Sequence, residues 1–228
     1  MNIKHFVTME NLELDTLMYL INRAIKLKNG SKSLLNKQYT IANIFFENST
    51  RTSVSFQRAE QKLNLDHIDL NPSISSLQKG ESLYDTLLTL KSLEIDAAVI
   101  RHNQEFYYEE LIENNSISII NAGDGTNQHP TQCLLDLMTI YEEYDSFKGL
   151  KIGIVGDLKH SRVAKSNIML LKKLGSEIYF SGPFFWFDKS FEEYGSYEEL
   201  DELIPKLDVL MLLRVQHKRH IDGEVFSK

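Results

Sequence analysis

The stretch from Ile44 to Phe56 places three hydroxyl side chains around one arginine. Ser49, Thr50 and Thr52 surround Arg51, directly after an apolar run typical of a buried strand. The apolar spacing then becomes helical, and a strand that leads straight into a helix N-terminus directs several unpaired backbone N–H groups at one point, which favours an anion. The hydroxyls alone would also fit an ordinary helix cap. An arginine adds a fork of donors that suits a phosphate or carboxylate, so the stretch predicts an anion site.

Arginines follow three further predicted strands. Arg101 comes after the strand 96–100, Arg162 follows the strand 151–156 by a short loop, and Arg214 comes directly after the strand 208–213. In parallel α/β sheets, ligands gather at the carboxyl ends of the strands. Each arginine alone fits a solvated surface charge. Together with the arginine of the first stretch, they predict a site for one or more ligands that carry several negative charges.

Two further positions could take part in chemistry. His129 and Gln132 stand three residues apart at the start of a predicted helix, so both can point to one place, and His129 could polarise a carbonyl or move a proton. A helix-capping histidine fits the same position. Lys79 ends a serine-rich segment at a helix start, where a cation is electrostatically out of place unless a bound anion lies beside it. A solvated lysine is the simpler interpretation.

Other kinds of site find little support in the sequence. Cys133 has no cysteine partner, and His217 with His220 lacks a third convincing metal ligand. The strand 151–156 ends in glycine and aspartate but lacks the Gly-x-Gly-x-x-Gly turn of dinucleotide-binding proteins, and no Gly-x-Ser-x-Gly nucleophile turn occurs. We therefore predict neither a metal nor a cofactor.

Strands and helices alternate along the chain, which predicts parallel sheets with helices on their faces. The fold class is therefore α/β, with two domains that each contain a mostly parallel sheet flanked by helices. A boundary near Phe147 to Gly149 separates domains 1–147 and 148–228. The predicted strands are 39–46, 66–70, 96–100, 116–120, 151–156, 177–181 and 208–213. The predicted helices are 8–29, 51–63, 80–93, 106–113, 130–144, 162–174 and one near 197–204.

Composition is that of an ordinary globular protein. The 228 residues are 42% hydrophobic and 25% charged, enough for one large or two small domains. The net charge of −7 argues against a general nucleic-acid surface. The single cysteine makes a reducing cytoplasm the natural compartment. No apolar run approaches the roughly 20 residues that span a membrane.

The motifs together resemble a known family. Phe45-Phe46-Glu47-x-Ser49-Thr50-Arg51-Thr52-x-x-Ser55-Phe56, followed by His129-Pro130-Thr131-Gln132, is similar to the carbamoyltransferases and in detail to the catalytic chains of aspartate carbamoyltransferases. Supporting matches run along the whole chain: Lys79-Gly80-Glu81-Ser82, Val99-Ile100-Arg101-His102, Asn121-Ala122-Gly123-Asp124-Gly125, Gly156-Asp157-Leu158-Lys159, Ser161-Arg162-Val163 and Leu213-Arg214-Val215-Gln216.

The resemblance implies a reaction. Carbamoyl phosphate would donate its carbamoyl group to the amine of L-aspartate, giving N-carbamoyl-L-aspartate and phosphate in pyrimidine biosynthesis. No metal, cofactor or covalent intermediate is implied, because orientation and charge stabilisation of a tetrahedral intermediate suffice.

The resemblance also implies a role for each candidate residue. The hydroxyl–arginine turn would hold the phosphate, Gln132 the carbamoyl nitrogen, and two later arginines the aspartate carboxylates. The full implied sets are Ser49, Thr50, Arg51, Thr52, Ser75, Lys79, Arg101, His129 and Gln132 for carbamoyl phosphate, and Lys79, Arg162, Arg214 and Gln216 for aspartate. Arg101, His129 and Thr52 would polarise the carbamoyl oxygen. Ser75 and Lys79 would reach into a neighbouring subunit of a homotrimer.

One departure from the family pattern and two rivals stay open. Family members continue past Lys228 through a His-Pro-x-Pro loop and a last helix, so we expect a truncated second domain with weak or absent turnover. Ornithine carbamoyltransferase shares the phosphate half, but its substrate carries a side-chain cation that Arg214 would repel. The other rival is a chain that only binds carbamoyl phosphate. The sequence does not reveal whether regulatory subunits bind.

Overall fold

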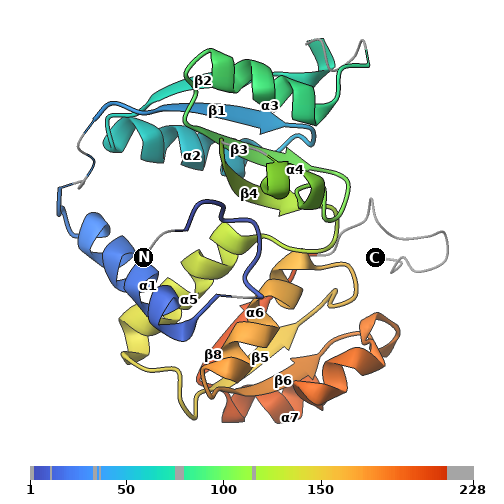
Figure 1. Cartoon of the computed structure of the whole chain (residues 1–228). Coiled ribbons are helices and arrows are strands. Elements are labelled where there is room, and N and C mark those ends of the chain that lie inside the picture. Colours follow the sequence, from blue (N-terminus) through green and yellow to red (C-terminus); the bar gives the residue numbers. More distant parts are fainter. Residues whose placement is uncertain are drawn as a thin grey trace. The chain divides into compact units, whose positions relative to one another are not determined.

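The computed structural model describes residues 3–10, 12–32, 35, 37–74, 80–114 and 117–214. The chain divides into two compact units, one of residues 1–11 and 22–131 and the other of residues 12–21 and 132–228. Each unit contains a four-stranded parallel sheet with flanking helices (Figure 1), which confirms the predicted fold class. The assignment of residues 1–147 to a carbamoyl-phosphate-binding domain and of residues 148–228 to an aspartate-binding domain stays a prediction.

The first unit is built on a sheet with the strand order β2-β1-β3-β4. Its strands are β1 (Thr40–Phe45), β2 (Asp66–Leu70), β3 (Ala97–His102) and β4 (Ser118–Asp124). The elements between them are α2 (Thr50–Lys62), the 3-10 turn η1 (Pro72–Ile74), α3 (Leu83–Ser92) and α4 (Glu109–Asn114). Because β1 is one of the two inner strands and leads through a short turn into α2, the predicted anion turn starts from the interior of the sheet.

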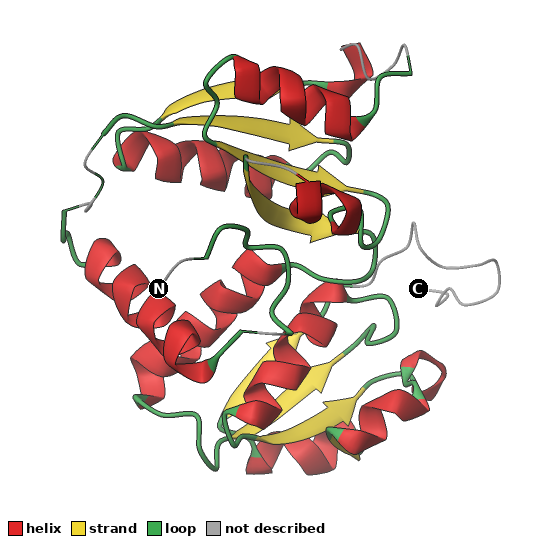
Figure 2. Ribbon diagram, viewed as in Figure 1, coloured by secondary structure: helices red, strands yellow, loops and turns green. Residues whose placement is uncertain are grey.

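Helices α2 and α3 cover opposite faces of this sheet (Figure 2). The strand residues Ala42 and Ile44 pack with Leu87 of α3. Ile41 faces the other way and belongs to a smaller cluster against which Phe56 of α2 packs. Successive residues of β1 thus pack on opposite faces, as expected for a strand that is buried on both sides. The packing of Phe56 against one face holds α2 on the sheet.

The second unit has the strand order β7-β6-β5-β8. Its strands are β5 (Lys151–Val155), β6 (Glu177–Ser181), β7 (Gly195–Tyr197) and β8 (Val209–Leu212). Its other elements are α5 (Pro130–Tyr144), α6 (Arg162–Lys173), η3 (Phe184–Trp186), η4 (Lys189–Glu193), α7 (Leu200–Leu203) and η5 (Ile204–Lys206), while α1 (Leu14–Lys28) has residues in both units. Trp186 and Phe180 are the largest fully buried side chains of the chain's described part.

The first helix is shorter than the sequence pattern predicts. It begins at Leu14, not near residue 8, because the preceding segment pairs with the sheet instead. Phe6 forms a parallel bridge with Ile120 of β4, and the backbone N–H of Met9 donates to the side chain of Gln128 at 3.0 Å. The backbone groups of this segment are thereby satisfied outside a helix.

The helix predicted near 197–204 is also partly wrong. Gly195 to Tyr197 form strand β7, which pairs with β6, and the helix is reduced to the four residues of α7. A Cβ atom at Gly195 would collide with the backbone of Ile178 on β6, so the close approach of the two strands depends on glycine. A tertiary contact therefore overrides the local pattern.

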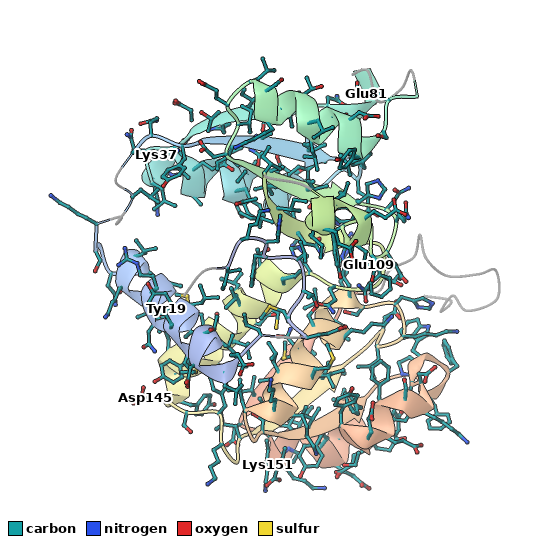
Figure 3. All side chains as sticks on the ribbon, in the orientation of Figure 1. Tyr19, Lys37, Glu81, Glu109, Asp145 and Lys151 are labelled. Atoms are coloured by element: carbon teal, nitrogen blue, oxygen red, sulfur yellow. The ribbon has the colours of Figure 1, made fainter. Side chains whose placement is uncertain are left out.

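The amino-terminal edge of the first sheet carries structural contacts. Lys37, labelled in Figure 3, pairs its Nζ with Asp96 Oδ1 at 3.1 Å. The other oxygen of Asp96 accepts a hydrogen bond from the backbone N–H of Thr40 at 3.0 Å. These contacts join the starts of β1 and β3.

A buried acidic group ties α2 to the sheet. Glu60 of α2 accepts a hydrogen bond from Asn43 Nδ2 on β1 at 3.1 Å, and its Oε1 and Asn43 Oδ1 are buried acceptors without a partner among the described residues. Burial raises the pKa of Glu60, and the charge of Asp69 adds to the shift, while hydrogen bonding from Asn43 and the proximity of His67 oppose it.

We predict that Glu60→Gln stabilises the protein, by roughly 1 kcal/mol in slightly alkaline buffer. Since the folded state raises the pKa of Glu60, it binds the proton more tightly than the unfolded chain, and the unaltered protein loses stability as the pH rises through that interval. The gain from Glu60→Gln should therefore be larger at pH 8 than at pH 5. Urea denaturation followed by circular dichroism measures it, with the exposed Glu110→Gln as the control. A gain independent of pH would contradict the prediction.

Candidate active site

The predicted anion turn forms where β1 meets α2. Ser49 is the N-cap of α2, yet its hydroxyl does not accept from a backbone N–H. It donates to Thr52 Oγ1 at 2.9 Å. By contrast, the N-cap Ser161 of α6 accepts from the backbone of Ala164 at 3.2 Å. No acidic residue lies in the first turn of α2, and Arg51 is exposed there. The first turn therefore keeps backbone N–H groups and a guanidinium for an external anion.

Arg101 lies directly beside this turn. It is the penultimate residue of β3 and lies opposite Phe45 in the β1–β3 register, and the backbone N–H of Phe46 donates to its carbonyl at 2.9 Å. The Arg101 side chain is 12% exposed, with one nitrogen 3.2 Å from Glu47 Oε2 and another donating to the carbonyl of Ala122 at 3.3 Å. Glu47 thus holds the guanidinium at the sheet edge, a partnership that sequence reasoning missed.

The histidine that follows Arg101 has a structural role. The His102 ring stacks against Tyr107 with centroids 5.2 Å apart and lies 4.4 Å from the ring of Phe46. Its Nδ1 accepts from the backbone N–H of Gln104 at 2.9 Å. Burial lowers the pKa of His102, against the opposing charges of Glu47 and Asp124. His102 is therefore a neutral imidazole that packs between aromatic rings at the edge of the sheet.

His129 reaches the same edge on the loop that follows β4. The residue is only 7% exposed, and its Nδ1 lies 3.4 Å from Thr131 Oγ1. Since β1, β3 and β4 are neighbours in the sheet, their carboxyl ends bring the hydroxyl–arginine turn, Arg101 and His129 to one edge. This is the grouping that the sequence predicted for the first half of the site.

A buried carboxylate builds the loop that carries His129. Asp124 is fully buried, and its Oδ1 accepts from Asn121 Nδ2 and the backbone N–H of Gln128, both at 3.0 Å. Its Oδ2 accepts from the backbone N–H of Phe106 at 3.0 Å and from Asn127 Nδ2 at 2.9 Å. Four donors match the four acceptor sites of an ionised carboxylate. Asp124 occurred in the sequence as part of a turn motif, but its structural importance was not apparent.

In the second unit, Gln132 lies in the first turn of α5. Its Nε2 donates to Asp136 Oδ1 at 2.9 Å, one helical turn further along. Asn167 of α6 donates to the other oxygen of Asp136 at 2.7 Å. Burial raises the pKa of Asp136, while the hydrogen bonds from Asn167 and Gln132 lower it. The four-residue spacing of Gln132 and Asp136 was the sequence signal for this contact.

The two later arginines follow neighbouring strands of the second sheet. Arg162 begins α6 after β5 and is 6% exposed, while Arg214 follows β8 and is exposed. Near Arg162, the fully buried Asp157 lies 2.8 Å from His160 Nδ1. Both arginines thus follow strand ends, as the sequence predicted, but on a different sheet from Arg51 and Arg101.

Three predicted site residues, Ser75, Lys79 and Gln216, lie outside the described residues. Within the described ranges, no group of three or more His, Cys, Asp or Glu side chains is placed to bind a metal ion. No helix in those ranges has both the length and the apolar character needed to cross a membrane.

The fold and these edges define a two-sheet α/β protein with anion-binding groups at its strand ends, and comparison with known proteins identifies its family. Residues 4–142 match the family described as aspartate/ornithine carbamoyltransferase, carbamoyl-P binding domain. The aspartate carbamoyltransferase catalytic subunit of Enterococcus faecalis is 58% identical over 230 residues, which cover all of this chain and 75% of that protein. The corresponding subunit of Lactococcus lactis is 55% identical and covers 99% of this chain and 74% of its own length.

Solved structures agree. The catalytic subunit of aspartate transcarbamoylase from M. jannaschii has a TM-score of 0.85 and 35% identity, over 97% of this chain and 77% of that one. Aspartate transcarbamoylase from Trypanosoma cruzi, in complex with carbamoyl phosphate and aspartate, has a TM-score of 0.83 and 30% identity, over 94% and 73%. The chain therefore belongs to the aspartate/ornithine carbamoyltransferase family.

We predict that Asp124→Asn lowers the free energy of unfolding by roughly 3 kcal/mol, because the NH₂ of an asparagine would face N–H donors that now donate to a carboxylate oxygen. Urea denaturation followed by circular dichroism measures the loss. Asp66→Asn, at the exposed start of β2, is the matched control and should change stability by less than about 0.5 kcal/mol. Equal effects of the two substitutions would show that the Asp124 network contributes little.

Proposed function

We propose that this chain is an aspartate carbamoyltransferase catalytic chain, which transfers the carbamoyl group of carbamoyl phosphate to the amine of L-aspartate. The observation that carries the proposal is the grouping at the carboxyl ends of β1, β3 and β4. There a helix N-terminus with Arg51 meets Arg101 and His129. Phosphate and a polarised carbonyl are the chemical groups that such donors suit.

The first half of the proposed site binds the donor substrate. Ser49, Thr50, Arg51 and Thr52 hold the phosphate with the backbone N–H groups of α2. Arg101, His129 and Thr52 donate to the carbamoyl oxygen. Two observations support this assignment: the Ser49 hydroxyl leaves the helix N–H groups uncapped, and Glu47 holds the Arg101 guanidinium beside them.

Catalysis then follows from charge and position. The aspartate amine attacks the carbamoyl carbon, a C–N bond forms, and one proton passes from that nitrogen to an oxygen of the phosphate that departs. The carbonyl oxygen gains negative charge in the tetrahedral intermediate, and cationic and N–H donors that are already in place stabilise it. The C–O bond to the phosphate then breaks, and the phosphate leaves on the donors of the α2 turn. No protein atom needs to bond covalently to the substrate.

The second half of the proposed site binds aspartate. Arg162 and Arg214 follow adjacent strands, and two cations at one sheet edge match the two carboxylates of this substrate. Ornithine would instead bring a side-chain ammonium to a guanidinium. The relatives matched across the whole chain are named aspartate carbamoyltransferase catalytic subunits, which also favours aspartate over the ornithine alternative.

The remaining assignments complete the proposal. Lys79 acts on both substrates and Ser75 on carbamoyl phosphate, each from a neighbouring subunit of a homotrimer. Gln216 assists aspartate binding, and the protein works in the cytoplasm. The sequence resemblance supports the site residues and the homotrimer, and the single cysteine supports a reducing compartment. Light scattering after size-exclusion chromatography tests the assembly, because a monomeric mass would contradict a homotrimer.

We predict that Arg51→Ala lowers aspartate-dependent phosphate release about a hundred-fold or more, since a preorganised charge contact of this kind is worth about 3 kcal/mol. Isothermal titration with carbamoyl phosphate should show weakened binding as well. Arg58→Ala is the matched control, because Arg58 is exposed on the same helix and donates to Gln61 Oε1 at 3.2 Å, away from the first turn. Unchanged kinetics in Arg51→Ala would remove this residue from the site.

For Arg214→Ala we predict at least a ten-fold rise in KM for aspartate with an unchanged Kd for carbamoyl phosphate, because only the acceptor loses a carboxylate partner. Lys206→Ala, which removes an exposed cation from the same unit, serves as the control. Release of phosphate with ornithine and not with aspartate would overturn the assignment of the acceptor. Binding of carbamoyl phosphate without any aspartate-dependent release would favour the binding-only alternative.

A further inference from the structure

Asp136 is a partly buried acidic group that the proposed chemistry does not use directly. It lies on α5 one turn after Gln132 and receives that residue's Nε2 at 2.9 Å. Its second oxygen receives Asn167 Nδ2 from α6 at 2.7 Å, and Asn167 is itself fully buried. Both oxygens of Asp136 are thus committed to amide nitrogens, one on each of two packed helices.

This contact selects one of the two orientations of the Gln132 amide. An ionised carboxylate only accepts hydrogen bonds, so it must face the NH₂ end of the amide. With the reverse orientation, the Gln132 oxygen would lie against the Asp136 oxygen, and two acceptors would repel each other. Asp136 therefore leaves the Gln132 oxygen as the end that is available to a substrate.

The available end matters for the group that is transferred. A carbamoyl group carries an NH₂ with two donors, which distinguishes it from an acyl group of the same shape such as acetyl. An amide oxygen can accept a hydrogen bond from that NH₂. An amide NH₂ is itself a donor, so it would repel the NH₂ of the carbamoyl group. The orientation of Gln132 hence decides whether it attracts or repels the carbamoyl nitrogen.

We propose that Asp136, held by Asn167, is a positioning residue that orients Gln132 so that its oxygen accepts from the carbamoyl NH₂ and rejects acyl phosphates lacking it. The inference rests on the proposed function, because it assigns the specificity of that same site. The hydrogen bond from Asn167 of α6 and the partial burial of Asp136 hold its carboxylate in one position, unlike a carboxylate that is free in solvent.

The test is a comparison of two ligands on Asp136→Asn. An asparagine offers both an oxygen and an NH₂, so the Gln132 amide is no longer forced into one orientation. Isothermal titration with carbamoyl phosphate and with acetyl phosphate gives the ratio of their Kd values. We expect Asp136→Asn to reduce the preference for carbamoyl phosphate about ten-fold, with little change for acetyl phosphate. Glu143→Gln, at an exposed position on the same helix, should leave the ratio unchanged.

A double-mutant cycle with Gln132→Ala separates positioning from a general structural role. If Asp136 acts through Gln132, Asp136→Asn should have no further effect on the ratio in the Gln132→Ala background. Equal weakening of both ligands, or an undiminished effect in that background, would overturn the inference. Should Asp136→Asn fail to fold, Asn167→Ala takes its place in the cycle with the same expectations.

The outcome also distinguishes this inference from the function on which it rests. An unaltered chain that binds carbamoyl phosphate no better than acetyl phosphate would overturn the positioning role alone. An unaltered chain that binds neither ligand would overturn the proposed function, and the inference with it.

Discussion

The first half of the site depends on one buried charge, the carboxylate of Asp124. A carboxylate without solvent is costly unless every lone pair is satisfied, and here four N–H donors surround it. Those donors come from the end of β4, from the loop before α5 and from the segment after β3. One side chain therefore fastens together the chain segments that carry Arg101 and His129. The N-terminal segment joins this network through Gln128, which accepts from Thr8 and Met9 and donates to Glu10.

An acidic acceptor also fixes a donor at two residues of the proposed site: Glu47 holds Arg101, and Asp136 holds Gln132. Outside that set, Asp157 lies beside His160 just before α6. In each case an acidic side chain fixes a donor that would otherwise occupy many rotamers. A reaction without a covalent intermediate needs such fixed donors, because its acceleration comes from charge that is placed before the substrate arrives.

Much of the fold could be predicted because the chain alternates cleanly between two hydrophobic periods. Strands β2 and β6 and helix α5 have the bounds that the sequence predicted. The predicted helix bounds were wrong where a segment distant in the sequence supplied the contact that decides the structure. Residues before Leu14 looked helical, yet they pair with β4, and the segment near Tyr197 extended a sheet because Gly195 allows close approach. No local pattern contains that information.

The sequence by itself determined the chemistry that is available at the strand ends: hydroxyls and an arginine at a helix start, further arginines, a histidine and a glutamine. This was possible because parallel strands place their carboxyl ends at one edge, so chain order alone predicts which side chains meet. Only the tertiary structure decided how these groups are held. The roles of the carboxylates of Glu47, Asp124 and Asp136 depend on partial or full burial and on the donors that the folded chain brings to them. Hydrogen-bond partners distant in the chain are set by packing, which no local spacing encodes.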